Sequence, residues 1–269
     1  MPLLHPFWIG CAFVIGACVG SFLNVCIYRI PRDISIVSPR SYCPSCGLSI
    51  PWFRNLPLLS WILQRGKAAC CGASFSFQYL LVELVTALFF ALLISLFPWP
   101  LALAYAVLIC LLIIGFFTDL EHLMIPDSVT IGGFVAGLIA SFFVPELHHV
   151  SSPFQALPQS ALGAAVGSFL LGSIAWLASR ILKKEAMGMG DVKLMACLGA
   201  FLGWQATLFS IAVGSLLGSL VGIAVLVIKH KKWGSHLMLP FGPFLMTAAI
   251  LWILGGKQLW AAYWATLFQ

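Results

Sequence analysis

Charged residues are scarce in this sequence: Asp, Glu, Lys and Arg together make up only 8% of its 269 residues, whereas 61% are hydrophobic. A soluble globular domain carries about a quarter of its residues as charges, because its surface must face water. Most of the few charges here lie between apolar runs that are as long as a membrane-spanning helix. The composition therefore excludes a soluble domain and predicts an all-α protein that crosses the membrane several times.

The apolar runs predict about eight transmembrane helices. They cover residues 3–28, 79–97, 101–118, 128–144, 160–182, 192–204, 205–228 and 239–254. The sixth run is short and almost continuous with the seventh, so a total of seven also fits the pattern. No period of 20 to 50 residues recurs along the chain, which argues against a repeat protein.

No Lys or Arg precedes the first apolar run, and the first basic residue is Arg29. A cleavable secretion signal begins with basic residues, so we expect the first run to stay as a span with its N-terminus outside. With eight spans, all of the 14 Lys and Arg residues except Lys257 fall on one side, which the positive-inside rule makes cytoplasmic. The net charge of +6 thus reflects topology and calls for no nucleic-acid partner.

One long segment, residues 31–78, lacks apolar runs and is expected to be a cytoplasmic insert between the first two spans. It contains Cys43 and Cys46 in the motif CPSC, followed by the adjacent Cys70 and Cys71. A Cys-x-x-Cys pair in a reducing compartment is more typical of a metal site than of a disulfide, and four thiolates would close a structural zinc site. Adjacent cysteines are a poorer chelating pair, so unligated thiols are the alternative.

Carboxylates at membrane depth are expensive, and those that occur there are candidates for function. Asp119 ends the third apolar run, and Asp191 begins the sixth, directly after Gly188-Met189-Gly190. On the predicted topology both aspartates lie at the cytoplasmic edge of the membrane, so they can meet. The glycines at 188 and 190 allow the backbone to bend and approach closely where the helix begins.

Two aspartates a few Å apart do not ionise together easily, so one holds a proton while the other activates a shared water. The pattern therefore indicates an aspartic-protease dyad of Asp119 and Asp191. The alternative is structural, with Asp191 capping a helix and Asp119 only ending one. Asp127 is expected to cap the fourth span and is the second candidate for the first catalytic position. Glu83, inside the second span, is expected to pair with a cation of the insert or to form a polar pocket.

Seven ordered sequence blocks carry a resemblance to a known family. They are GSFLNVCIYRIP (20–31), CPSC (43–46), NLPLLSW (55–61), LVEL (81–84), DLEHLMIPD (119–127), KKEAMGMGDVKL (183–194) and LPFGP (239–243). The chain resembles the bacterial type IV prepilin peptidases, which belong to the GxGD intramembrane aspartyl proteases. These are leader peptidases and N-methyltransferases of type IV pili and type II secretion.

The resemblance implies that Asp119 and Asp191 are the catalytic aspartates, supported by Gly188 and Gly190. It also implies that the loop with Pro240, Gly242 and Pro243 lies near the active site, and that no catalytic metal takes part. The implied domains are residues 1–98, with the methyltransferase region, and residues 99–269, the peptidase domain.

The resemblance further implies a multi-pass protein of the bacterial inner membrane, in contact with the lipid bilayer. The implied substrates are prepilins or pseudopilins with a short basic leader, cut at the cytoplasmic face. The enzyme then methylates the new N-terminus, with S-adenosylmethionine as the methyl donor. No glycine-rich Rossmann fingerprint is present, so the sequence does not reveal where the methyl donor binds.

The chain departs from the family pattern at one position. Relatives with the cysteine motif carry Cys-x-x-Cys twice, whereas this chain has Ala68 in place of the third cysteine. A zinc site then needs Cys70 or another ligand. Another class of function, a metal or proton-coupled transporter lined by Asp119, Asp191 and Glu83, is the alternative, although the inverted repeats typical of transporters are not evident.

Overall fold

The computed structural model describes residues 6–43, 45–184, 187–228 and 239–267. Over these ranges the chain is helical, and its only β-type pairs are two isolated bridges, Tyr42 with Ser49 and Lys67 with Ser74. The predicted all-α fold is therefore confirmed. Three cytoplasmic lysines of the topology argument, Lys229, Lys231 and Lys232, lie outside the described residues, as do Pro44 and the first residues of the first apolar run.

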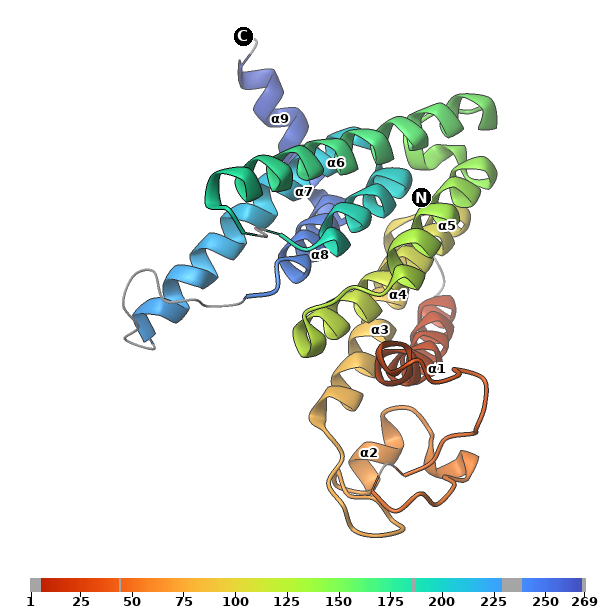
Figure 1. Cartoon of the computed structure of the whole chain (residues 1–269). Helices are drawn as coiled ribbons and strands as arrows, with labels where there is room; N and C mark the ends of the chain where they lie inside the picture. The colour runs from red at the N-terminus through yellow and green to blue at the C-terminus, as the bar shows by residue number, and fades with distance from the viewer. Residues whose placement is uncertain (1–5, 44, 185–186, 229–238, 268–269) are drawn as a thin grey trace. The chain divides into compact units, whose positions relative to one another are not determined.

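Most of the described chain lies in α-helices of ten or more residues (Figure 1). They are α1 (Pro6–Arg29), α3 (Phe77–Leu96), α4 (Trp99–His122), α5 (Asp127–Phe143), α6 (Pro153–Leu182), α7 (Met189–Ile228), α8 (Gly242–Leu251) and α9 (Lys257–Leu267). A short helix, α2 (Leu59–Leu63), lies in the insert between α1 and α3.

The chain divides into two compact units, Met1–Ile114 and Gly115–Gln269, with the division inside α4. The boundary at residues 98 and 99 stays a prediction.

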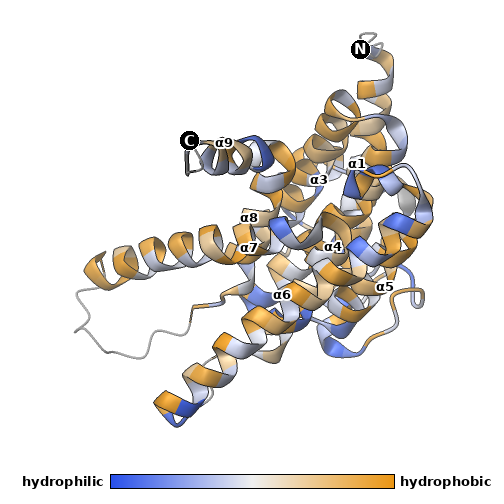
Figure 2. Ribbon diagram, turned by 90° about the horizontal axis from the view of Figure 1, so that it is seen from above, coloured by the Kyte–Doolittle hydropathy of each residue, from blue (hydrophilic) through white to orange (hydrophobic). Residues whose placement is uncertain are grey.

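Six helical stretches among the described residues are long and apolar enough to cross a membrane. They are Pro6–Arg32, Phe77–Leu96, Trp99–His122, Pro153–Leu182, Met189–Ile228 and Gly242–Thr266. A seventh apolar helix, Asp127–Phe143, is shorter. Hydrophobic residues run along the whole length of these helices in Figure 2, as expected of surfaces that face lipid. The protein is thus a multi-pass membrane protein.

Helix α7 is two helical legs that meet at Gly203. The backbone there has φ 81° and ψ 174°, a conformation that glycine adopts without a steric penalty. A Cβ built on Gly167 of α6 would lie 2.7 Å from the carbonyl oxygen of Met195 and 2.9 Å from Cγ2 of Thr207. These two residues would be about 18 Å apart in a straight helix, so the chain reverses at Gly203. The break at Gly203 lies next to the predicted boundary between the sixth and seventh apolar runs. The total of eight spans stays a prediction.

The carbonyl group of Ala200, three residues before the break, accepts hydrogen bonds from two other helices. The hydroxyls of Ser141 and Ser160 donate to this oxygen at 3.1 and 2.7 Å, from α5 and α6 respectively. Both serines are buried, so these bonds satisfy a backbone acceptor that lipid could not. The bonds also tie α5, α6 and α7 together in the second unit.

In the first unit, α1 and α3 pack along each other at close range. A Cβ built on Gly20 would lie 2.7 Å from Cα of Glu83, so the approach requires glycine there. Arg29, at the end of α1, is buried and donates to the carbonyl oxygens of Ser35 and Pro39, both at 2.8 Å. These bonds hold the start of the insert against the end of α1.

Candidate active site and thiol cluster

Asp119 lies near the C-terminal end of α4, and only 6% of its surface is exposed. The helix ends just beyond it, where Leu123 has a φ of 54° and its N–H donates to the carbonyl oxygen of Asp119 at 3.0 Å. The tight turn keeps the aspartate next to the loop before α5. The carboxylate is therefore held by a helix end and is shielded from bulk water.

Asp191 lies in the first turn of α7 and is 8% exposed. Its backbone N–H donates to the carbonyl oxygen of Gly188 at 3.2 Å, which forms part of the turn that opens the helix. The N-terminus of a helix carries a partial positive charge, which favours a carboxylate at this position.

Gly242, the first residue of α8, lies between the two aspartates. A Cβ built on it would be 2.6 Å from Oδ2 of Asp119 and 3.3 Å from Oδ1 of Asp191. The two oxygens are therefore separated by no more than the sum of these distances. The backbone N–H of Gly242 donates to Asp119, so the N-terminus of α8 also faces the pair. Pro243 follows in the first helical turn, where a missing N–H costs nothing.

The arrangement suits general acid–base chemistry on a water molecule. The charge of Asp119 acts directly on Asp191, and both are buried. Burial and mutual repulsion favour a state in which one carboxyl group holds a proton and the other is charged. Such a pair can take a proton from water and give one to a leaving group.

The other predicted site residues have different contacts. The expectation that Asp127 caps α5 is wrong: Pro126 is the N-cap and Asp127 is the first helical residue. Its exposed carboxylate pairs with Lys193 at 2.7 Å. Among the described residues, a Cβ on Gly188 would meet nothing within 4 Å, and one on Gly190 would lie 3.5 Å from Ile125, an ordinary contact. Neither glycine has a positive φ, so the close approach that the sequence placed at GMG occurs at Gly242 instead. Pro240 lies in the irregular segment directly before α8.

Sequence reasoning missed Ile125. This buried residue lies in the loop between α4 and α5, and its Cδ1 would be 2.9 Å from a Cβ on Gly242. It therefore packs against the backbone that separates the two aspartates. The sequence signal that could have indicated a buried Ile125 was its apolar side chain directly before Pro126, in the short loop after a helix end.

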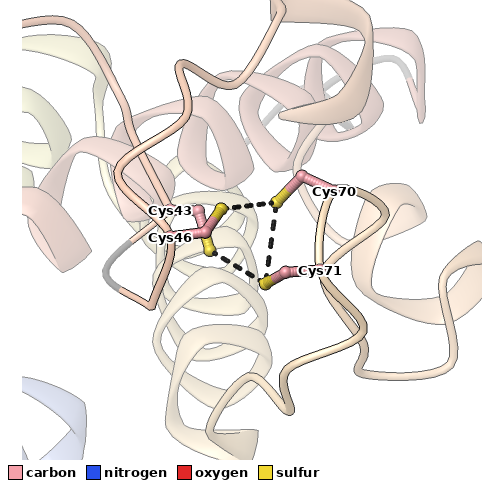
Figure 3. Close-up of side chains that lie close together, drawn as sticks. All are labelled: Cys43, Cys46, Cys70 and Cys71. Carbon is pink, nitrogen blue, oxygen red and sulfur yellow. Dashed lines mark hydrogen bonds between the residues drawn. The ribbon is translucent and has the colours of Figure 1, made fainter.

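The four insert cysteines come together in the first unit (Figure 3). Their sulfur atoms all lie within 4.8 Å of one another, with separations of 3.7 Å for Cys43 and Cys71, 3.4 Å for Cys46 and Cys70, and 3.9 Å for Cys70 and Cys71. A tetrahedral zinc ion with Zn–S bonds of about 2.3 Å places its ligands about 3.8 Å apart. The donor set thus fits a tetrahedral thiolate site.

Two matching turns hold these thiols. In the first, the N–H of Cys43 donates to Leu48 at 2.8 Å and the N–H of Gly47 donates to Cys43 at 2.8 Å. In the second, Ala68 bonds to Ala73 and Gly72 bonds to Ala68, both at 2.7 Å. Ala68 therefore stands where Cys43 stands in the first turn, as the family pattern indicated. Cys70 supplies the fourth sulfur from a different position of its turn.

The turns also set the protonation of the thiols. Backbone N–H groups of Cys46 and Ser45 bond to the sulfur of Cys43 and lower its pKa to about 6. The hydrogen bond between Cys70 and Cys46 is the main cause that raises the pKa of Cys70 to about 12. A thiolate at Cys43 is thus available near neutral pH, and thiolates are the form that binds metals.

Fold and site together define a class: a multi-pass helical membrane protein with a buried carboxylate pair at helix ends and a separate cluster of four thiols. Residues 106–223 match the Type IV leader peptidase family, and residues 14–97 match the Bacterial Peptidase A24 N-terminal domain. No solved structure matches the chain.

Curated relatives agree with the family match. A prepilin leader peptidase/N-methyltransferase of Stutzerimonas stutzeri is 35% identical over 94% of this chain and 92% of its own length. The protein of that name from Pseudomonas aeruginosa is 33% identical over 98% of both. One from Myxococcus xanthus is 42% identical over 80% of this chain, which spans 62% of that relative. The chain belongs to the type IV leader peptidase family, a family of proteases.

Proposed function

We propose that this chain is a membrane-embedded aspartic endopeptidase that removes the leader from prepilins or pseudopilins and then N-methylates the new N-terminus. The family and the names of its curated relatives support both activities. Nothing in these relatives supports the transporter alternative. The observation that carries the peptidase mechanism is the buried pair of Asp119 and Asp191, held on either side of Gly242.

Each aspartate has one role in the proposed hydrolysis. The charged carboxylate takes a proton from a water molecule, which attacks the carbonyl carbon of the scissile bond. The protonated carboxyl group gives its proton to the departing nitrogen as the C–N bond breaks. The pair again carries one negative charge after this step. The N-termini of α7 and α8, which lie near the pair, stabilise this charge. No metal takes part in this step.

The proposed location is the bacterial inner membrane, with the N-terminus outside and the aspartates at the cytoplasmic face. The distribution of Lys and Arg supports this orientation. The leader and the new N-terminus of the substrate are then cytoplasmic, whereas the apolar part of the substrate lies in the bilayer. The proposed partners are pilins of a type IV pilus or a type II secretion system, with no nucleic acid.

Two groups complete the proposed function. Cys43, Cys46, Cys70 and Cys71 would hold a structural zinc ion, which would join the two turns of the insert. The proposed methyl donor, S-adenosylmethionine, supplies an electrophilic methyl group on a sulfonium. The N-methyltransferase names of the relatives support such a donor.

The test is cleavage of a basic-leader prepilin by the full-length enzyme in lipid nanodiscs, followed by mass spectrometry. We expect Asp119→Asn and Asp191→Asn to lose cleavage by about 10³-fold or more, because each removes one half of the acid–base pair. Asp127→Asn is the matched control, and its cleavage rate should stay close to that of the wild type. Full activity in Asp191→Asn would overturn the peptidase mechanism.

A further inference from the structure

A cavity in the first unit lies between α1, α3 and the cysteine-containing insert. It is partly open to solvent, and its empty space together with this open solvent is about 1200 Å³. Small-molecule sites in proteins are concave and mostly apolar, with a few precisely placed polar groups. Its walls combine aromatic side chains with a few polar groups, as such sites do.

The cavity wall contains a buried carboxylate with no cation beside it. Glu83 of α3 is 8% exposed, and its Oε2 accepts the N–H of Leu58 at 2.7 Å. No Lys or Arg nitrogen of the described residues lies within ion-pair distance of it. Of the two expectations for Glu83, the polar pocket is therefore the one found. A buried carboxylate is stabilised when a cationic ligand binds next to it.

Aromatic rings and an unsatisfied donor line the same cavity. Tyr42, Trp61 and Tyr79 contribute to its wall. The indole N–H of Trp61 is buried and has no hydrogen-bond partner among the described residues. An unpaired buried donor costs about 1–3 kcal/mol, which an acceptor on a ligand would recover. Rings of this kind also stack on a purine base and attract a cation to their faces.

The two arginines of the cavity differ in their contacts. Arg29 is committed to backbone carbonyl groups of the insert. Arg54 is exposed, and its guanidinium lies 5.8 Å from the ring of Phe53. An exposed guanidinium at the wall of a cavity is suited to bind a carboxylate in a bidentate manner.

We propose that this cavity binds S-adenosylmethionine, with Glu83 beside the sulfonium, the aromatic wall against the adenine and Arg54 on the methionine carboxylate. This assignment rests on the methyltransferase part of the proposed function. The acceptor amine forms its bond to the methyl carbon as the C–S bond breaks. The positive charge passes from sulfur to nitrogen, and the amine then releases a proton to water. The product, a neutral thioether, loses its attraction to Glu83 and leaves more easily.

The test compares the binding of S-adenosylmethionine and S-adenosylhomocysteine to the full-length enzyme in nanodiscs by equilibrium dialysis. The two ligands share every group except the methyl group and its charge. We expect Glu83→Gln to weaken binding of the sulfonium about tenfold, while the thioether changes less than about twofold. The amide oxygen of the variant can still accept the N–H of Leu58, so folding should be retained. Glu146→Gln, on an exposed loop of the second unit, is the matched control.

Arg54→Gln is the second variant, and it lies on the surface, where folding tolerates the change. It should weaken both ligands equally, by about tenfold, because both carry the amino-acid carboxylate. Arg40→Gln, elsewhere in the insert and outside the cavity wall, should change neither affinity.

The outcomes distinguish a wrong assignment of the cavity from a failure of the proposed methyltransferase function. If the wild type binds and transfers the methyl group but both variants bind normally, the cavity is the wrong site and the proposed function stands. Equal loss of both ligands in Glu83→Gln would refute the charge contact with the sulfonium. If the wild type neither binds the donor nor methylates a cleaved pilin, the methyltransferase function fails and the site fails with it.

Discussion

The carboxylate pair and the thiol cluster are held in place by different means. Asp119 and Asp191 are distant in sequence and buried, and three helix ends bring them together. The four cysteines belong to one insert, three of them are exposed, and turns rather than helices position them. A site made of helix ends depends on packing, whereas a site made of turns depends on local hydrogen bonds and on what the sulfurs bind. The two sites should therefore fail independently.

The largest expected effect separates the two activities. Asp191→Asn should lower leader cleavage by about 10³-fold or more, because the pair loses an ionisable group. Methylation of a peptide that already begins at the mature N-terminus should continue at the wild-type rate. Mass spectrometry of both reactions in one preparation measures the two rates. Parallel loss of both would show that the sites are coupled.

Gly242→Ala should slow leader cleavage by about 10–100-fold, since the added methyl group would meet the carboxylate of Asp119 at 2.6 Å and displace it. Gly188→Ala is the matched control, because a Cβ there meets nothing within 4 Å in the part of the chain that the structure describes. Steady-state kinetics should show the loss in kcat. Equal rates for the two variants would mean that contact with Gly242 does not position the aspartates.

Cys70→Ser should lower the zinc content of the purified protein from about one ion per chain, because it removes one of four ligands. Ala68→Cys in the same chain should restore it, since residue 68 occupies the place of Cys43 in the matching turn. Metal analysis by mass spectrometry measures the content, and leader cleavage should persist in both. A wild-type protein without zinc would contradict a metal site in the insert.

The smallest effect is expected at the surface of the second unit. Lys193→Gln breaks the ion pair with Asp127, and exposed pairs contribute only about 0.2–1 kcal/mol. The melting temperature should fall by a few degrees at most, and cleavage should stay within about threefold of the wild type. A loss as large as that of Asp191→Asn would place this ion pair in the catalytic machinery.

Much of the helical architecture was predictable because lipid imposes it. Long apolar runs must form helices in the bilayer, and the helices α3, α4 and α5 follow the predicted runs closely. The break in α7 was visible only as a weak interruption near Trp204 and Gln205. The sharp turn of the backbone there depends on Gly203. The carbonyl group of Ala200, just before the turn, accepts hydrogen bonds from serines of two other helices.

The sequence by itself determined the membrane class, the aspartates at the ends of apolar runs and the cysteines of the insert. Each of these follows from residue type and spacing, since a charge in lipid and a Cys-x-x-Cys pair are local features. Only the tertiary structure decided that Gly242 lies between the aspartates with Ile125 packed against it, that Cys70 takes the fourth thiol position and that Glu83 lines a cavity. These placements depend on how close separate segments approach, which packing sets and local pattern does not record.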